Sequence, residues 1–259
     1  MSNIKRNKHK KTKIKNTDNA SIKSSINSGE QNTLIYKIKL LISLTKPGII
    51  VGNLFTLIAG FFLAVAHHRA NINNIPLNIY LYCLITIFGI SFVIASGCVF
   101  NNYIDQDIDS RMQRTKNRVL VKKLISNKIA IVYAFILGLI GLFLLYFFTN
   151  KLAFSLALFG FIIYLFIYTM IFKRTSVYGT LIGSMSGAVP PVVGYCAITN
   201  SFDIGAIILF AMLSFWQMPH SFAIAIYRLN DNGEYLRNLK KAKFYIDSEI
   251  EEYEKEKIK

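Results

Sequence analysis

The segment IYLYCLITIFGISFVIASGCVFNNYIDQDID, residues 79–109, joins a long apolar run to a cluster of acidic residues. Its first part, residues 79–100, is an apolar run without a charged side chain, and its last part carries three closely spaced aspartates. A run of this length can cross the ~30 Å hydrocarbon core of a bilayer as a helix. The polar part therefore lies where a membrane span meets water.

The aspartates of this stretch follow a helical spacing. Asn101, Asp105 and Asp109 stand at i, i+4 and i+8, which places them on one helix face, one turn apart. Two stacked carboxylates repel each other unless a cation separates them. Mg²⁺ suits such a site because it takes one or two carboxylates together with substrate phosphates. Arg114 and Arg118 follow, and guanidinium groups bind phosphate, so the segment predicts a Mg²⁺–diphosphate site.

The composition identifies a membrane protein. The chain has 259 residues, of which 53% are hydrophobic, and a formal net charge of +16. The charges avoid the apolar runs, which is typical of polytopic membrane proteins. The predicted fold is an all-α transmembrane bundle with six spans, at residues 49–66, 79–100, 129–148, 152–172, 178–198 and 204–227.

The basic residues between the spans predict the topology. They gather in the segments 101–128 and 173–177, whereas the segments between the other spans carry only Arg69 and Lys151. By the positive-inside rule, both termini and the two basic segments face the cytoplasm. The aspartates then share the cytoplasmic side with Lys173 and Arg174. We expect a multi-pass protein of a bacterial inner membrane.

Three regions are predicted along the chain. Residues 1–40 form a basic, polar tail that is expected to be disordered and cytoplasmic. Residues 41–231 form the transmembrane domain, and residues 232–259 form a charged tail. The lysines follow the positive-inside rule and no nucleic-acid recognition motif is present, so nucleic acid is not an expected partner.

Span five contains small residues and a break. Gly179, Gly183 and Gly187 recur at every fourth position, which favours close helix packing in membranes. Pro190 and Pro191 follow at the expected depth of the bilayer. A broken helix there is tolerated against protein or a cavity, and a ligand cavity is one interpretation.

Three motifs carry a family resemblance: CVFNNYIDQDIDSRMQRTKNRVLV at 98–121, GAVPP at 187–191 and WQMPH at 216–220. Together they resemble the protoheme IX farnesyltransferases, or haem O synthases, a branch of the UbiA superfamily of intramembrane prenyltransferases. The aspartate motif alone points to the superfamily, and the other two motifs are specific for the haem branch. The resemblance covers roughly residues 40–231.

The resemblance implies a reaction. Farnesyl diphosphate is joined to a vinyl group of haem B with addition of water, and the product is haem O. Mg²⁺ would be held by Asp105 and Asp109, with Asn101 as a neutral ligand or orienting group, and Asn102 replaces the aspartate usual in the superfamily. The lipid bilayer is a partner, and a haem A synthase or terminal oxidase would use the product.

Further site residues are implied by matching positions. Arg114, Arg118, Lys173 and Arg174 would bind diphosphate, although basic residues at span ends also act as interfacial anchors. Asp231 stands in the superfamily's second aspartate-rich region, where it would help to hold a second Mg²⁺ or form an ordinary helix-end charge pair.

The carbocation left when diphosphate departs would be stabilised by aromatic faces. The candidates, which the sequence does not rank, are Tyr103, Tyr164, Tyr168, Tyr178 and Tyr195.

His220 lies in span six with Trp216 one turn earlier. An ionisable residue inside a membrane is a functional candidate by default. His220 would bind haem as an axial ligand to the iron, with Trp216 as a second haem-binding residue. Alternatively, His220 would act as a base. Both roles remain open.

Family members have nine membrane helices, against six predicted here, so the transmembrane domain is expected to be C-terminally incomplete. Three explanations are open: a shortened working enzyme, a frameshifted or decaying product, or a fragment completed by another chain. Two alternative functions also stay open, an inactive family member and a UbiA-type prenyltransferase with an aromatic acceptor.

Overall fold

The structure, a computed structural model, describes residues 34–67, 78–112, 115–173 and 179–227. Helices make up most of these residues, and no strand occurs among them. The chain divides into two units, residues 1–43 and 44–259. Helix α2 (Leu34–Leu44) belongs to the first unit up to Ser43, and its Leu34, Ile35 and Ile38 are exposed. The helical bundle belongs to the second unit.

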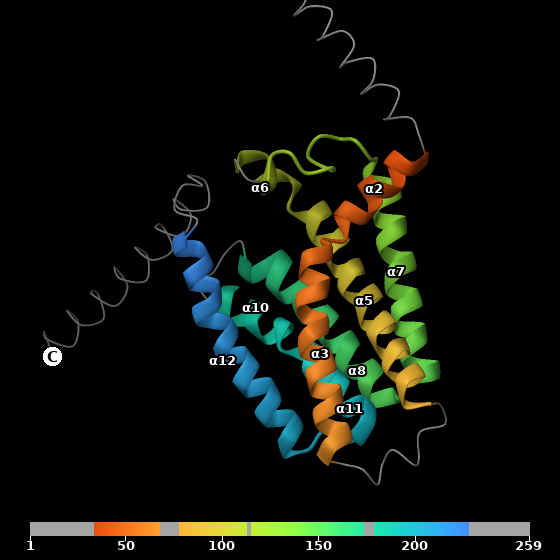
Figure 1. Ribbon diagram of the computed structural model, residues 1–259. Helices are drawn as coiled ribbons and strands as arrows, with labels where there is room; N and C mark the ends of the chain where they lie inside the picture. Colours follow the sequence, from red (N-terminus) through yellow and green to blue (C-terminus); the bar gives the residue numbers. More distant parts are fainter. Residues whose placement is uncertain (1–33, 68–77, 113–114, 174–178, 228–259) are drawn as a thin grey trace, which may run out of the picture. The chain divides into compact units, whose positions relative to one another are not determined.

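Six helical stretches of this bundle are long and apolar enough to cross a membrane (Figure 1). They confirm the six predicted spans, and the protein is an all-α, multi-pass integral membrane bundle. The short α6 (Gln106–Arg111) follows the second span. In chain order the spans are α3 (Pro47–His67), α5 (Ile79–Ile104), α7 (Asn127–Phe148), α8 (Lys151–Ile162) with the π-helix η1 (Ile163–Phe172), α10 (Gly179–Gly187) with α11 (Val189–Thr199), and α12 (Ile204–Tyr227).

Helices α3 and α11 pack with their backbones in contact. A Cβ atom added to Gly194 would lie 2.2 Å from the carbonyl oxygen of Leu57, and one added to Gly60 would lie 2.1 Å from that of Pro191. Only glycine fits at both positions. Small residues allow this approach in membranes, where packing contributes more than hydrophobicity to helix association.

Span five is broken where the prolines predict it. Helix α10 ends at Gly187 and α11 begins at Val189, with Pro190 and Pro191 in its first turn. A helix tolerates proline there because the first backbone N–H groups have no partner within the helix. Ala188 bridges the two pieces, since its N–H donates to the Ser184 carbonyl at 3.1 Å. The predicted break is confirmed.

Span four changes from an α-helix to a π-helix at Ile163, which the sequence did not predict. The Thr169 hydroxyl donates to the carbonyl of Tyr164, five residues earlier, at 2.8 Å. A π-helix has wider turns than an α-helix and frequently occurs at functional sites. Here it brings Tyr164, Tyr168 and Thr169 towards the end of α5.

The α3–α11 contact can be tested with Gly194→Ala. The added methyl group would force the two backbones apart, so we expect the free energy of unfolding in detergent to fall by about 2 kcal/mol. The matched control is Gly52→Ala in the same bundle, because a Cβ atom at Gly52 meets nothing within 4 Å. The control should be neutral or stabilising by up to about 1 kcal/mol. Equal effects of the two substitutions would contradict this packing.

Candidate active site

Asn101, Asp105 and Asp109 share one helix face, as their spacing predicts. Helix α5 ends before Asp105, yet the helical bonds continue: the Asp105 N–H donates to the Asn101 carbonyl at 3.0 Å, and the Asp109 N–H to the Asp105 carbonyl at 2.8 Å. The exposed fractions of the three residues are 3%, 0% and 4%. Buried carboxylates require partners, because an isolated buried charge is very costly.

Basic side chains from distant segments supply those partners. Lys173, at the end of span four, forms an ion pair with Asp105. Arg118, from the segment after α6, forms one with Asp109. The Asn101 side-chain amide donates to Asp105 Oδ2 at 2.8 Å, which links the two levels of the helix face. Each carboxylate is thus paired with a cation from a different segment of the chain.

A third cation, Lys46, was missed as a site residue. Its Nζ donates to Asn101 Oδ1 at 2.6 Å. The backbone of Lys46 has φ 54°, a left-handed conformation that costs a non-glycine residue roughly 1–3 kcal/mol and is found at functional sites. The Asn102 amide anchors this turn by donating to the Leu44 carbonyl at 2.8 Å.

The environment of Lys46 disfavours its charge. The pKa of Lys46 is lowered to about 8, mainly by burial; the nearby cations Arg118 and Lys173 contribute to the shift, and Cys98 and Asp109 oppose it. A lysine with a lowered pKa gains from any nearby anion. The surroundings of Lys46 therefore favour binding of a negatively charged ligand.

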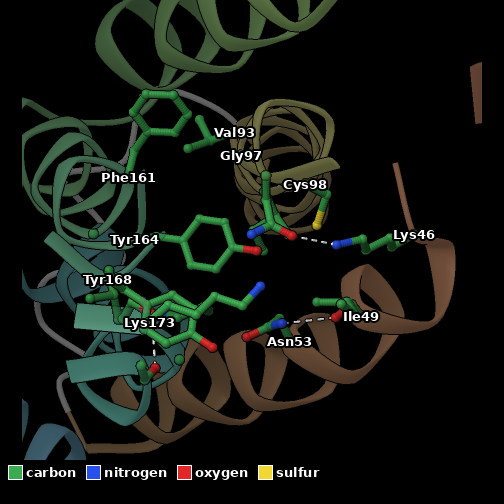
Figure 2. A pocket seen from close by; sticks show the side chains of 18 of the residues that line it. Lys46, Ile49, Asn53, Val93, Gly97, Cys98, Phe161, Tyr164, Tyr168 and Lys173 are labelled. Atoms are coloured by element: carbon green, nitrogen blue, oxygen red, sulfur yellow. Dashed lines mark hydrogen bonds between the residues drawn. The ribbon is translucent and has the colours of Figure 1, made fainter. Parts of the chain in front are cut away.

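These polar groups stand at one end of a cavity of about 450 Å³ (Figure 2). Among the described residues that line it, three are basic (Lys46, Arg118 and Lys173) and one is acidic (Asp109). Asp105 is fully buried, and its partner Lys173 lines the cavity. The polar end is therefore electropositive and suits an anion. The rest of the lining is largely apolar and includes Ile90, Val93, Ala157, Phe161 and Val189.

Two tyrosines of the π-helix line this cavity. The rings of Tyr164 and Tyr168 stack with centroids 5.8 Å apart, and Figure 2 shows both on the same side of the cavity as Lys173, across from Lys46. Of the other candidates, Tyr103 is exposed, the Tyr195 hydroxyl donates to Asp203 at 3.3 Å, and Tyr178 lies outside the described residues. Among the candidates that lie in the described residues, only Tyr164 and Tyr168 line the cavity.

Other predicted site residues lie apart from this cluster. Trp216 and His220 are exposed on α12, where their rings stack at 4.9 Å and 11°, and neither lines the cavity. Their neighbours Gln217 and Ser221 line it instead. Arg114, Arg174 and Asp231 fall outside the described residues.

The oxygen atoms of these side chains are the potential ligands for a metal ion. Within the described residues, no group of three or more His, Cys, Asp or Glu could hold a metal ion. Two carboxylates and the Asn101 amide oxygen nevertheless match what Mg²⁺ takes from a protein when substrate phosphates complete its coordination. This donor set fits Mg²⁺ bound together with an anionic substrate.

The chain is a membrane bundle with two buried aspartates beside a largely apolar cavity, and comparison with known proteins shows its family. The model of the UbiA prenyltransferase family matches residues 53–236. The chain belongs to the UbiA prenyltransferase family.

Curated relatives narrow the resemblance. The chain is 58% identical over 194 residues to a protoheme IX farnesyltransferase of Cronobacter sakazakii, covering 75% of this chain and 63% of the relative. It is 57% identical to one of Yersinia enterocolitica, covering 75% and 62%. The chain thus spans somewhat less than two thirds of the length of these relatives.

A solved structure shares the fold. It is that of a digeranylgeranylglyceryl phosphate synthase, with a TM-score of 0.59 and 21% identity, covering 77% of this chain and 65% of that one. At this identity the similarity concerns the fold alone.

The Lys173–Asp105 pair makes a stability prediction. Lys173→Met removes an ion-pair partner of the buried Asp105, so we expect a loss of about 3 kcal/mol in the free energy of unfolding. Adding Asp105→Asn removes the buried charge and should restore most of the loss. The exposed Lys122 provides the control, since Lys122→Met should change the unfolding free energy little. Additive losses in the double variant would contradict the pairing.

Proposed function

We propose that this chain transfers the farnesyl group of farnesyl diphosphate to a vinyl group of haem B, giving haem O. One observation supports the donor: the cation-held Asp109 and the fully buried Asp105 beside it lie at the polar end of a cavity whose remaining lining is largely apolar. A prenyl diphosphate has the same two ends, one anionic and one apolar. The acceptor is proposed from relatives named protoheme IX farnesyltransferase.

The proposal gives the cations two successive partners. Without substrate, Lys173 and Arg118 neutralise the carboxylates. In the proposed complex, Asp105, Asp109 and Asn101 would hold Mg²⁺, which supplies charge neutralisation of the leaving diphosphate. Lys173 and Arg118 would then no longer pair with the carboxylates, and together with Lys46 they would bind the diphosphate oxygens. Arg114, Arg174 and Asp231 are proposed as further contacts to diphosphate and Mg²⁺.

The apolar part of the cavity would protect the reaction. When the carbon–oxygen bond to diphosphate breaks, an allylic carbocation remains, and the stacked rings of Tyr164 and Tyr168 would stabilise it by cation–π attraction. Exclusion of water prevents its hydrolysis. The vinyl group of haem B then forms the new carbon–carbon bond. Water adds to the cation that remains on the haem side and releases a proton, which leaves a hydroxyl group.

The haem contacts are proposed on α12. The stacked Trp216 and His220 present aromatic rings on the surface of that helix. His220 would serve as an axial ligand or a base. We place the protein in a bacterial inner membrane, with both termini and the polar end of the cavity on the cytoplasmic side. A haem A synthase or a terminal oxidase would receive the product.

Haem extraction from a haem-O-deficient bacterial host that expresses this chain tests the function. Chromatography and mass measurement should find haem O with the native chain and none with Asp105→Ala, Asp109→Ala. The control is Asp107→Ala, which alters an exposed carboxylate of the same segment and should leave haem O in place. No haem O from a membrane-inserted native chain contradicts the proposal, and a prenylated aromatic compound instead would identify a different acceptor.

Metal dependence is a separate prediction. A chelator should abolish haem O formation by the purified chain, and added Mg²⁺ should restore it. Asp109→Asn removes one charge from the ligand set, so it should raise the Mg²⁺ concentration needed for half-maximal rate by about 10-fold or more. A rate that is indifferent to the chelator would exclude the metal from this proposal.

A further inference from the structure

The apolar end of the cavity is closed by three residues. Ile90 of α5, Ala157 of α8 and Val189 of α11 line it and are only 2%, 2% and 5% exposed. One helical turn beyond, Ala153 and Val193 are fully buried in the core. The cavity therefore ends here, and Ile90, Ala157 and Val189 are called its floor below.

The floor lies at a definite depth below the polar end. Helix α5 contributes both levels, with Asn101 at the polar end and Ile90 at the floor. The eleven helical steps between them rise about 16 Å, since an α-helix rises ~1.5 Å per residue. This is roughly half the ~30 Å thickness of the hydrocarbon core, so the cavity does not run through the membrane.

We propose that this floor sets the length of prenyl chain that the site accepts, and that Ala157 is its limiting position. The inference rests on the proposed function, because it requires the diphosphate to lie at Lys46, Arg118 and Lys173. A prenyl chain extends away from its diphosphate, so its far end meets the floor. Ala157 has the smallest side chain of the three floor residues, so a larger residue at this position would extend into the cavity.

Substitutions of the floor residues should make the cavity shallower or deeper. Ala157→Leu adds bulk at the closed end and should exclude the last isoprene unit of a farnesyl chain while leaving room for a geranyl chain. Ile90→Val and Ile90→Ala remove methyl groups and should admit a longer chain. A single methylene in an apolar pocket changes discrimination by about 10- to 200-fold, so whole isoprene units give large effects. Non-specific loss of structure is not expected to shift the preferred chain length in opposite directions in the two sets of variants.

Binding measures this without relying on turnover. The probes are unreactive thiolodiphosphates that carry geranyl, farnesyl or geranylgeranyl chains, titrated with Mg²⁺ into the purified full chain. We expect the native chain to bind the farnesyl probe more tightly than the geranylgeranyl probe. Ala157→Leu should lower the farnesyl-to-geranyl affinity ratio by about 10-fold or more. Ile90→Ala should raise the geranylgeranyl-to-farnesyl ratio.

Two control substitutions change the size of a side chain at positions that do not line the cavity. Ser155→Leu adds a similar side chain on the exposed face of the same helix, and Leu84→Ala removes one from the exposed face of α5. Neither should change the ratios. If Ala157→Leu or Ile90→Ala does not fold, Ala157→Val and Ile90→Val test the same directions with smaller changes.

The outcomes distinguish the two proposals. Unchanged ratios in the floor variants, or equal native affinity for the farnesyl and geranylgeranyl probes, would overturn the floor. A native chain that binds none of the three probes would instead contradict the proposed prenyl diphosphate site itself.

Discussion

Two carboxylates that are buried one helical turn apart require positively charged partners from the surrounding chain. Asp105 and Asp109 are almost inaccessible, and burying either without a partner would be very costly. Lys173, at the end of span four, pairs with Asp105. Arg118, from the segment after α6, pairs with Asp109. The same pairing thus assembles the polar end of the cavity and joins segments that are distant in the sequence.

This arrangement combines two environments along one helix. The last turns of α5 carry polar groups among cations, whereas the turns before Gly97 face apolar side chains. Close backbone contacts at Gly60 and Gly194 pack α3 against α11. The break before Pro190 brings Val189 and Pro190 to the cavity wall. A ligand with an anionic head and an apolar tail matches both environments, which is the physical basis for the proposed prenyl diphosphate.

Much of this could be predicted because it depends on local patterns. Apolar runs of bilayer length predicted the six spans, the i, i+4, i+8 spacing predicted the shared helix face, and Pro190 and Pro191 predicted the break. The roles assigned to these residues stay predictions.

The remaining features depend on tertiary contacts. Lys46 reaches Asn101 across 55 positions through a left-handed turn, and no local pattern encodes that distance. The π-helix of span four is stabilised by the contacts of Thr169 with Tyr164 and Asn101. The orientation of α12, which directs Gln217 rather than His220 to the cavity, likewise follows from helix packing.

The most direct test of the account is whether the buried carboxylates exchange their cations for a metal when a prenyl diphosphate binds. The measurement is the affinity of the purified chain for farnesyl thiolodiphosphate, titrated with Mg²⁺ and again with a chelator. The account predicts binding that requires Mg²⁺, and Mg²⁺ binding that is strengthened by the analogue. Equal affinity with and without Mg²⁺ would contradict it.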